Sequence, residues 1–169
     1  MANDAWFDGY HGETTEELLA LANEYRIDSL VLAFEEAIQR KAESGPISKE
    51  ERTVLAVEGL EREVNNGGYG QFFLNSSREF VDVIEEALVA IGCPKTASIS
   101  AAAIAALGLG SELTPDKAEA VILADEDPVR EALGECDNRY YENDEAIADR
   151  LFAWIRENRG QVRVAGPGR

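Results

Sequence analysis

The chain has 169 residues, of which 45% are hydrophobic and 29% charged, so it is long and apolar enough to fold around its own core. Its 33 acidic and 16 basic residues give a formal net charge of -17, which argues against direct binding to nucleic acid or an anionic membrane. A basic protein is the favoured kind of partner, although such acidity also suits a saline habitat or simple solubility.

Cellular location is suggested by the cysteines and by the absence of targeting patterns. The two cysteines, Cys93 and Cys136, form no CxxC pair, and we expect buried free thiols of the kind common in a reducing compartment. The N-terminal residues lack the basic and apolar regions of a signal peptide. The longest uncharged stretch, residues 96–111, is too short to span a bilayer. We therefore expect a cytoplasmic protein that does not bind a membrane.

Helix signals dominate the first half of the chain, and no strand pattern of period two persists anywhere. Capping boxes predict helices that begin after Thr14 and Ser48, and Asp28 is expected to cap a helix between them. The helix after Ser48 should end at the Asn-Asn-Gly-Gly turn of residues 65–68. A short aromatic segment, residues 69–74, follows it.

The second half of the chain continues the helical pattern. Ser77 is expected to cap a helix that ends near Gly92, and an Ala-rich helix should cover residues 95–107. Thr114 and the following proline begin another helix, which should run to about residue 123. Two more helices are predicted from about residue 127 and from about residue 144 to residue 158.

These elements predict an all-α fold, a single-domain multi-helix bundle of about seven to nine helices. The domain should span residues 14–160, preceded by an N-terminal extension, residues 1–13, and followed by a frayed C-terminal tail, residues 161–169.

The acidic residues are concentrated in two blocks. Residues 1–37 contain nine acidic residues and one basic residue, and residues 112–149 contain thirteen and three. In the second block, acidic residues at i, i+4 and i+8 form a stripe on one helix face. We expect a partner to contact Asp127, Glu131, Glu135, Glu142, Glu145 and Asp149, with Glu13, Glu16 and Glu17 as a second patch.

Catalytic chemistry finds little support in the sequence. His11 is the only histidine, so no Ser-His or Cys-His nucleophile can be built without it. No phosphate-binding glycine loop, EF-hand loop or structural zinc pattern is present. We therefore predict a protein that is not an enzyme and has no cofactor and no metal.

One segment, VNNGGYGQFFLNSS (residues 64–77), is not explained by amphipathicity. It could form a polar pocket that binds a small ligand or catalyses a reaction, with Glu61 or Glu63 as the acid. It could also be a structural corner in which glycines supply positive φ, aromatic rings fill the core and amides satisfy backbone groups; we favour this second reading. The pocket reading uses Tyr69, Phe72 and Phe73 as walls and Asn65, Asn66, Gln71 and Asn75 as hydrogen-bonding groups.

The same segment resembles the signature of a bacterial domain-of-unknown-function family whose named members are called DNA-mimic proteins. The signature falls here at Glu61 or Glu63, Asn66, Gly67, Gly68, Tyr69, Gln71, Phe72 or Phe73, and Asn75-Ser76. Similar features continue with Ala-Ile-Gly at residues 90–92 and with Asp137, Tyr140 and Tyr141. The resemblance covers about residues 28–160 and implies an all-α fold with an acidic surface. For the named members it implies binding to a DNA-binding protein where DNA would sit.

Our leading hypothesis is an acidic protein-binding module, a DNA mimic that occupies the DNA-binding surface of a basic partner such as a transcriptional regulator. The alternatives are a small-ligand or catalytic pocket at the Asn-Gly-Gly-Tyr-Gly-Gln corner and an immunity-type inhibitor of a basic nuclease. A homodimer is one of the assemblies that the sequence allows.

Overall fold

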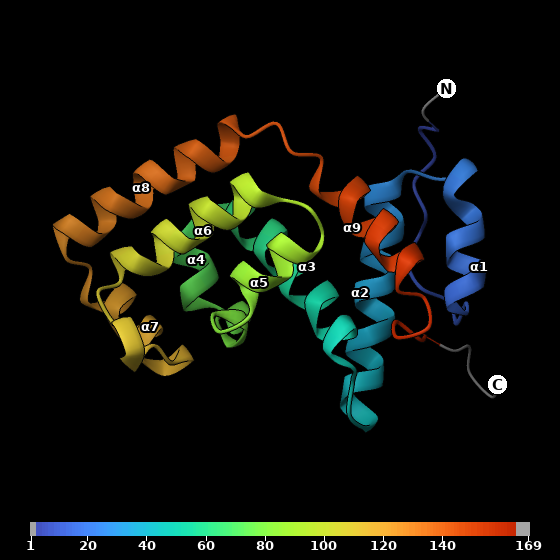
Figure 1. Ribbon diagram of the computed structural model, residues 1–169, viewed down its shortest axis with the longest axis horizontal. Helices are drawn as coiled ribbons and strands as arrows, with labels where there is room; N and C mark the ends of the chain where they lie inside the picture. Colours follow the sequence, from blue (N-terminus) through green and yellow to red (C-terminus); the bar gives the residue numbers. More distant parts are fainter. Residues whose placement is uncertain (1–2, 165–169) are drawn as a thin grey trace. The chain divides into compact units, whose positions relative to one another are not determined.

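The computed structural model describes residues 3–164, and this part of the chain contains nine α-helices, three short 3-10 helices and no strand (Figure 1). The all-α prediction is therefore confirmed. The helices are α1 (Thr15–Ala20), α2 (Ile27–Ser44), α3 (Lys49–Gly67), α4 (Tyr69–Leu74), α5 (Ile84–Ala90), α6 (Pro94–Ala106), α7 (Pro115–Ala124), α8 (Asp127–Glu142) and α9 (Ile147–Glu157), with 3-10 helices η1 (Leu21–Asn23), η2 (Ser76–Phe80) and η3 (Gly110–Glu112).

The helices form two compact units. The first contains residues 1–58 and 146–169, and the second contains residues 59–145. Helix α3 begins in the first unit and ends in the second. The single domain expected at residues 14–160 stays a prediction.

The first unit is built around α2, which packs against α1 and α9. The rings of Phe34 on α2 and Phe152 on α9 meet edge to face, with centroids 6.5 Å apart. The N-terminal extension is also part of this unit, because Phe7 and Tyr10 are buried. The backbone N–H of Phe7 donates to Ser29 Oγ over 3.0 Å, and that of Tyr10 donates to Glu36 Oε2 over 2.9 Å.

The segment after α9 returns to the start of α1. Val162 and Val164 are both buried, and Thr15 connects to them through its backbone and its side chain. Thr15 Oγ1 donates to the carbonyl of Val162 over 2.8 Å and accepts from the N–H of Val164 over 2.9 Å. Residues 161–164, which were expected to fray, are thus packed because two valines gain burial. The rest of the expected tail, residues 165–169, lies outside the described residues.

The second unit has α6 at its centre, between α5 and α8, while α4 packs against α7 and α8 (Figure 1). Tyr69, Phe72 and Phe73 of α4 are each no more than 1% exposed and supply the largest side chains of this core. The short aromatic segment expected from the sequence is therefore a buried helix.

Helix starts agree with the sequence at three of the expected caps. Thr14 and Glu17 form a capping box, and so do Ser48 and Glu51. The hydroxyl of Thr114 accepts from the N–H of Lys117.

Three further expected starts are wrong in detail. Asp28 does not cap α2, because the helix begins at Ile27 with Arg26 as its N-cap residue, and the Asp28 carboxylate binds Arg26 instead. Ser77 is buried in η2, and its hydroxyl donates to the carbonyl of Phe72, so α5 begins only at Ile84. Helix α9 begins at Ile147 rather than near residue 144.

Among residues 3–164, no helix combines the length and the apolar character that crossing a bilayer requires.

The packing of the C-terminal segment can be tested at Val162, which is fully buried. We expect Val162→Ala to lower the free energy of unfolding by about 2 kcal/mol, because it removes two buried methyl groups and leaves a cavity. Urea denaturation followed by circular dichroism measures this change. The matched control is Val89→Ala, at a position that is 59% exposed, where a change below about 0.5 kcal/mol is expected. Equal effects at both positions would show that the segment is not packed.

Candidate functional site

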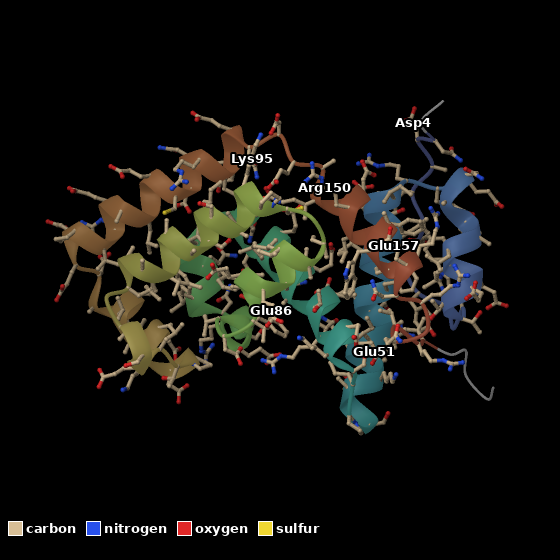
Figure 2. All side chains as sticks on the ribbon, in the orientation of Figure 1. Asp4, Glu51, Glu86, Lys95, Arg150 and Glu157 are labelled. Carbon is tan, nitrogen blue, oxygen red and sulfur yellow. The ribbon has the colours of Figure 1, made fainter. Side chains whose placement is uncertain are left out.

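The solvent side of α8 carries a row of carboxylates. Asp127, Glu131, Glu135 and Glu142 are all exposed, and we call them the acidic face of α8. On the opposite side of the helix, Leu133, Cys136 and Tyr140 are buried. Side chains project from α8 on the side away from α6 (Figure 2). Four of the expected contact residues therefore lie together on one helix, where a partner could reach them.

The acidic face of α8 is only partly neutralised. Arg130 forms ion pairs with Asp125 and with Asp127. The carboxylates of Glu131, Glu135 and Glu142 make no ion pair or hydrogen bond with the described part of the chain. Arg139 lies on the same helix and is also exposed. The row thus holds three carboxylates without a partner of their own.

Glu145 differs from its neighbours because it caps another helix. Its carboxylate accepts from the N–H groups of Lys95 and Thr96, at the first turn of α6, and from the Thr96 hydroxyl. Figure 2 shows Lys95 at this end of α6. Desolvation opposes ionisation of Glu145, but the hydrogen bonds outweigh it and the pKa is lowered. This carboxylate therefore caps the N-terminus of α6.

The expected second patch lies in the first unit, and its carboxylates are also engaged locally. Glu13 Oε2 accepts from the N–H of His11, and Glu17 Oε2 accepts from the N–H of Thr14. Glu16 lies 3.5 Å from Arg159 Nε. These three residues are on the surface, but their charges have partners.

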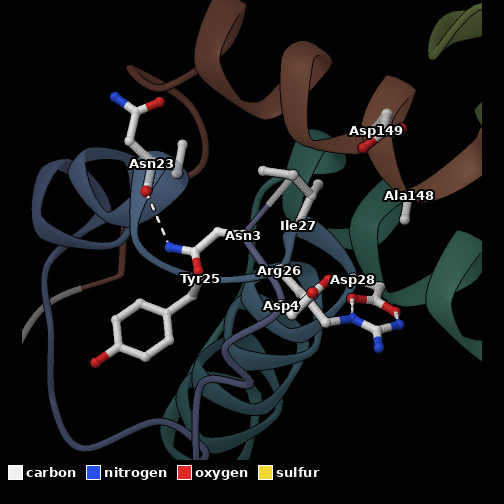
Figure 3. Close-up of a pocket in the computed structure, with 10 residues that line it drawn as sticks. Asn3, Asp4, Asn23, Tyr25, Arg26, Ile27, Asp28, Ala148 and Asp149 are labelled. Atoms are coloured by element: carbon white, nitrogen blue, oxygen red, sulfur yellow. Dashed lines mark hydrogen bonds and ion pairs between the residues drawn. The ribbon is translucent and has the colours of Figure 1, made fainter. Parts of the chain in front are cut away.

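Asp149 also belongs to the first unit, where it lines a polar hollow of about 590 Å³ (Figure 3). In this hollow the Arg26 guanidinium binds both oxygens of Asp28, and the side-chain amide of Asn3 donates to the carbonyl of Asn23. These four residues pair among themselves, whereas the Asp149 carboxylate makes no hydrogen bond or ion pair with the described residues. Asp149 belongs to the first unit, whereas the acidic face of α8 belongs to the second.

The Asn-Gly-Gly corner is filled by its own aromatic side chains. Tyr69, Phe72 and Phe73 are buried, and the Tyr69 hydroxyl lies 2.8 Å from Ser100 Oγ. Burial raises the pKa of the Tyr69 phenol, so this group stays neutral. Asn65 and Asn66 are exposed, and neither side chain makes a hydrogen bond with residues 3–164. The walls expected for a polar pocket are instead part of the core.

Of the two glutamates considered for the corner, Glu63 is the one that forms hydrogen bonds with it. Its carboxylate is buried, and Oε2 accepts from Gln71 Nε2 over 2.7 Å and from Asn75 Nδ2 over 2.8 Å. Gln71 and Asn75 therefore bind Glu63 and join α4 to α3. Hydrogen bonds to a buried carboxylate stabilise the local structure, and they occupy groups that a substrate would otherwise contact.

Two glycines make this turn possible. Gly68 has φ +83° and ψ -177°, a conformation that is essentially restricted to glycine. A Cβ at Gly68 would lie 2.4 Å from the Asp137 carboxylate, and one at Gly67 would overlap the side chain of Gln71. Asp137 Oδ1 accepts from the N–H of Tyr69 over 2.7 Å, so it caps α4 from α8. Tyr141 adds a 2.6 Å hydrogen bond from its hydroxyl to the carbonyl of Val64.

A family model described as DMP19-like protein matches residues 45–158, which is more than half of the chain. The chain belongs to the DMP19-like family. No curated protein and no solved structure matched the chain. The matched residues include the Asn-Gly-Gly corner, the Asp137 cap and the whole of α8.

Within this DMP19-like region, most residues of the Asn-Gly-Gly corner could be identified from the sequence, but no role could be assigned to Asp137. The resemblance contained Asp137 and Tyr141, which both hydrogen-bond to the corner. The available signal was a glycine pair followed by a short helical segment with no Ser, Thr, Asp or Asn at its N-cap, since the first N–H groups of such a helix need an acceptor from elsewhere.

Glu61, the other glutamate considered for the corner, has different surroundings. It is half-buried on α3, and its carboxyl group makes no hydrogen bond or ion pair with the residues that the structure describes. Burial raises the pKa of its carboxyl to about 7. Nor does any group of three or more His, Cys, Asp or Glu side chains in residues 3–164 have the geometry to hold a metal ion.

The role of Gly68 can be tested by Gly68→Ala. We expect the free energy of unfolding to fall by at least about 2 kcal/mol, since the methyl group meets the Asp137 carboxylate and alanine disfavours positive φ. The control is Gly70→Ala, where a Cβ meets open space within a helix, so stability should be unchanged or rise by up to about 1 kcal/mol. Chemical denaturation of both variants is the measurement, and equal losses would contradict the assigned geometry.

The raised pKa of Glu61 predicts a pH-dependent effect of Glu61→Gln. The unfolded chain releases this proton near pH 4.5 and the folded chain near pH 7, so the wild type loses stability as pH rises between those values. The variant should match the wild type at pH 4 and exceed it by roughly 2 kcal/mol at pH 8, allowing for partial solvation of the side chain. Denaturation at both pH values tests this. The control is Glu43→Gln, at an exposed position, which should differ from the wild type by the same amount at both pH values. If Glu61→Gln is no more stable than the wild type at pH 8, the prediction is wrong.

Proposed function

We propose that the protein is an acidic binding module whose partner is a basic DNA-binding protein, and that it acts as a DNA mimic by covering that partner's DNA-binding surface. The observation that supports this most is the row of exposed carboxylates on α8, three of which have no partner among the described residues. A cytoplasmic location, where such partners act, is part of the proposal.

Charge spacing on α8 favours a partner that binds phosphates. Residues four apart on a helix are separated by about 6 Å along the axis. A strand of duplex DNA carries one charge per about 3.4 Å. Asp127, Glu131 and Glu135 therefore have roughly half the linear charge density of one strand, and Glu142 continues the row at a wider spacing. Such a surface gives fast and salt-sensitive association with a basic protein.

A binding role is favoured over a catalytic one by the state of the corner. Its aromatic residues are in the core, and Gln71 and Asn75 are both held by Glu63. A catalytic role would depend instead on Glu61, whose carboxyl group has a raised pKa. An inhibitor of a basic nuclease would use the same acidic face, and the identity of the captured partner distinguishes it from a DNA mimic.

The proposal is tested by reversing the unpaired charges with Glu131→Lys, Glu135→Lys and Glu142→Lys together. Immobilised wild type should capture a basic DNA-binding protein from host lysate at low salt and release it at about 0.5 M salt, where charges are screened within a few Å. Duplex DNA should compete for the same partner. We expect the triple variant to lose at least about 90% of the captured partner, because attraction becomes repulsion across the contact.

The matched control reverses three exposed glutamates of the first unit, Glu24→Lys, Glu43→Lys and Glu157→Lys, and changes the net charge by the same amount. It should retain most of the partner. Equal losses in both triple variants would mean that only net charge matters, and retention by both would exclude the acidic face of α8.

A further inference from the structure

A groove of about 310 Å³ lies between the C-terminal part of α7, the first half of α8 and the glycine corner. Its apolar lining comes from Val121, Ile122, Val129 and Leu133. The three valine and isoleucine side chains are partly exposed, whereas Leu133 is buried. The volume is at the low end for a ligand site, which suits one long side chain or a small molecule rather than a helix.

Glycines keep this groove open. Gly67, Gly70 and Gly134 line it, and Gly134 lies in the middle of α8 with no positive φ to require a glycine. A Cβ at Gly70 or at Gly134 would meet nothing within 4 Å. A glycine inside a helix costs up to about 1 kcal/mol of stability relative to alanine. Gly70 and Gly134 carry this cost although neither packing nor backbone geometry requires a glycine at their positions.

The charged groups at the groove favour a cation. Asp125, Glu126 and Asp137 line it together with Arg130, and Arg130 already pairs with Asp125 and Asp127. The carboxylate of Glu126 has no ion pair or hydrogen bond with the described residues. The groove therefore offers an apolar wall with uncompensated negative charge beside it, which complements a side chain that has an aliphatic stem and a positive end.

Asp137 is the least exposed of the three carboxylates that line the groove, so it is the one that the cationic end of an inserted side chain meets. Its Oδ1 accepts from the N–H of Tyr69, and no other hydrogen bond to this carboxylate is present in residues 3–164. A guanidinium gains most from two free oxygens of one carboxylate, whereas an ammonium needs only one acceptor. We propose that the groove is a socket for a lysine side chain of the basic partner. This inference rests on the proposed function and adds to it the residue type that the partner inserts.

The experiment uses decalysine and decaarginine peptides, which carry the same charge, as probes of the full-length protein. Fluorescence anisotropy gives the affinity for each peptide, and methyl NMR reports on Val121, Ile122, Val129 and Leu133. For the wild type we expect methyl shifts with decalysine and much smaller shifts with decaarginine. Gly134→Leu should fill the groove and weaken decalysine binding about tenfold, while decaarginine binding changes less than twofold.

The melting temperature of Gly134→Leu and two further variants separate loss of the groove from loss of the fold. Gly134→Leu should melt at or above the wild-type temperature, because leucine is the better helix former. Asp137→Asn keeps an oxygen that can accept from Tyr69 but removes the charge, and it should also lose the preference for decalysine. Ala105→Leu adds a leucine at an exposed helical position outside the groove and should bind both peptides as the wild type does.

Unchanged decalysine binding by Gly134→Leu would overturn the socket. If the α8 triple variant then still loses both peptides, the proposed acidic face survives without the groove. If neither peptide responds to that triple variant, the proposed function fails as well. Stronger methyl shifts with free spermine than with decalysine would assign the groove to a small diffusible amine, which also overturns the lysine assignment.

Discussion

The hydrogen bond from the Tyr69 N–H to the Asp137 carboxylate connects two helices that are far apart in the sequence, and the second unit is organised around it. It caps α4 from α8 and holds the chain close to Gly68, where a side chain could not fit. Tyr69 then places its ring in the core and its hydroxyl against Ser100. Because α8 is fixed by this contact and by its packing on α6, its opposite side must face solvent.

The acidic residues of the chain have two different physical uses. Some are consumed within the fold, as when Glu51 is held by Lys41 and by the N–H groups of Ser48 and Arg163. Others have no partner in the described structure and remain available to solvent. A net charge of -17 therefore does not say how many carboxylates a partner can reach, since those of the second kind are the ones that exchange water and counterions for basic side chains most readily. The useful quantity is the spacing of unpaired carboxylates on a rigid helix.

The sequence predicted the helical class well because apolar periodicity and local caps are properties of neighbouring residues. It succeeded at Thr14 and Ser48, whose side chains bind backbone groups three residues away. It failed to separate Glu145 from the other acidic residues, since its partners Lys95 and Thr96 lie some fifty residues earlier. The groove was also beyond prediction, because only the packed structure shows that Gly134 faces open space.

The return of the C-terminal segment to Thr15 has a consequence for the order in which the two units fold. The second unit is one continuous stretch, so all of its contacts lie within residues 59–145. The first unit combines segments from before and after that stretch, and the contact between Thr15 and Val162 spans 147 positions. Loop closure over such a distance is slow. The N-terminal helices therefore lack part of their core until this contact forms, and the second unit can assemble before they are complete.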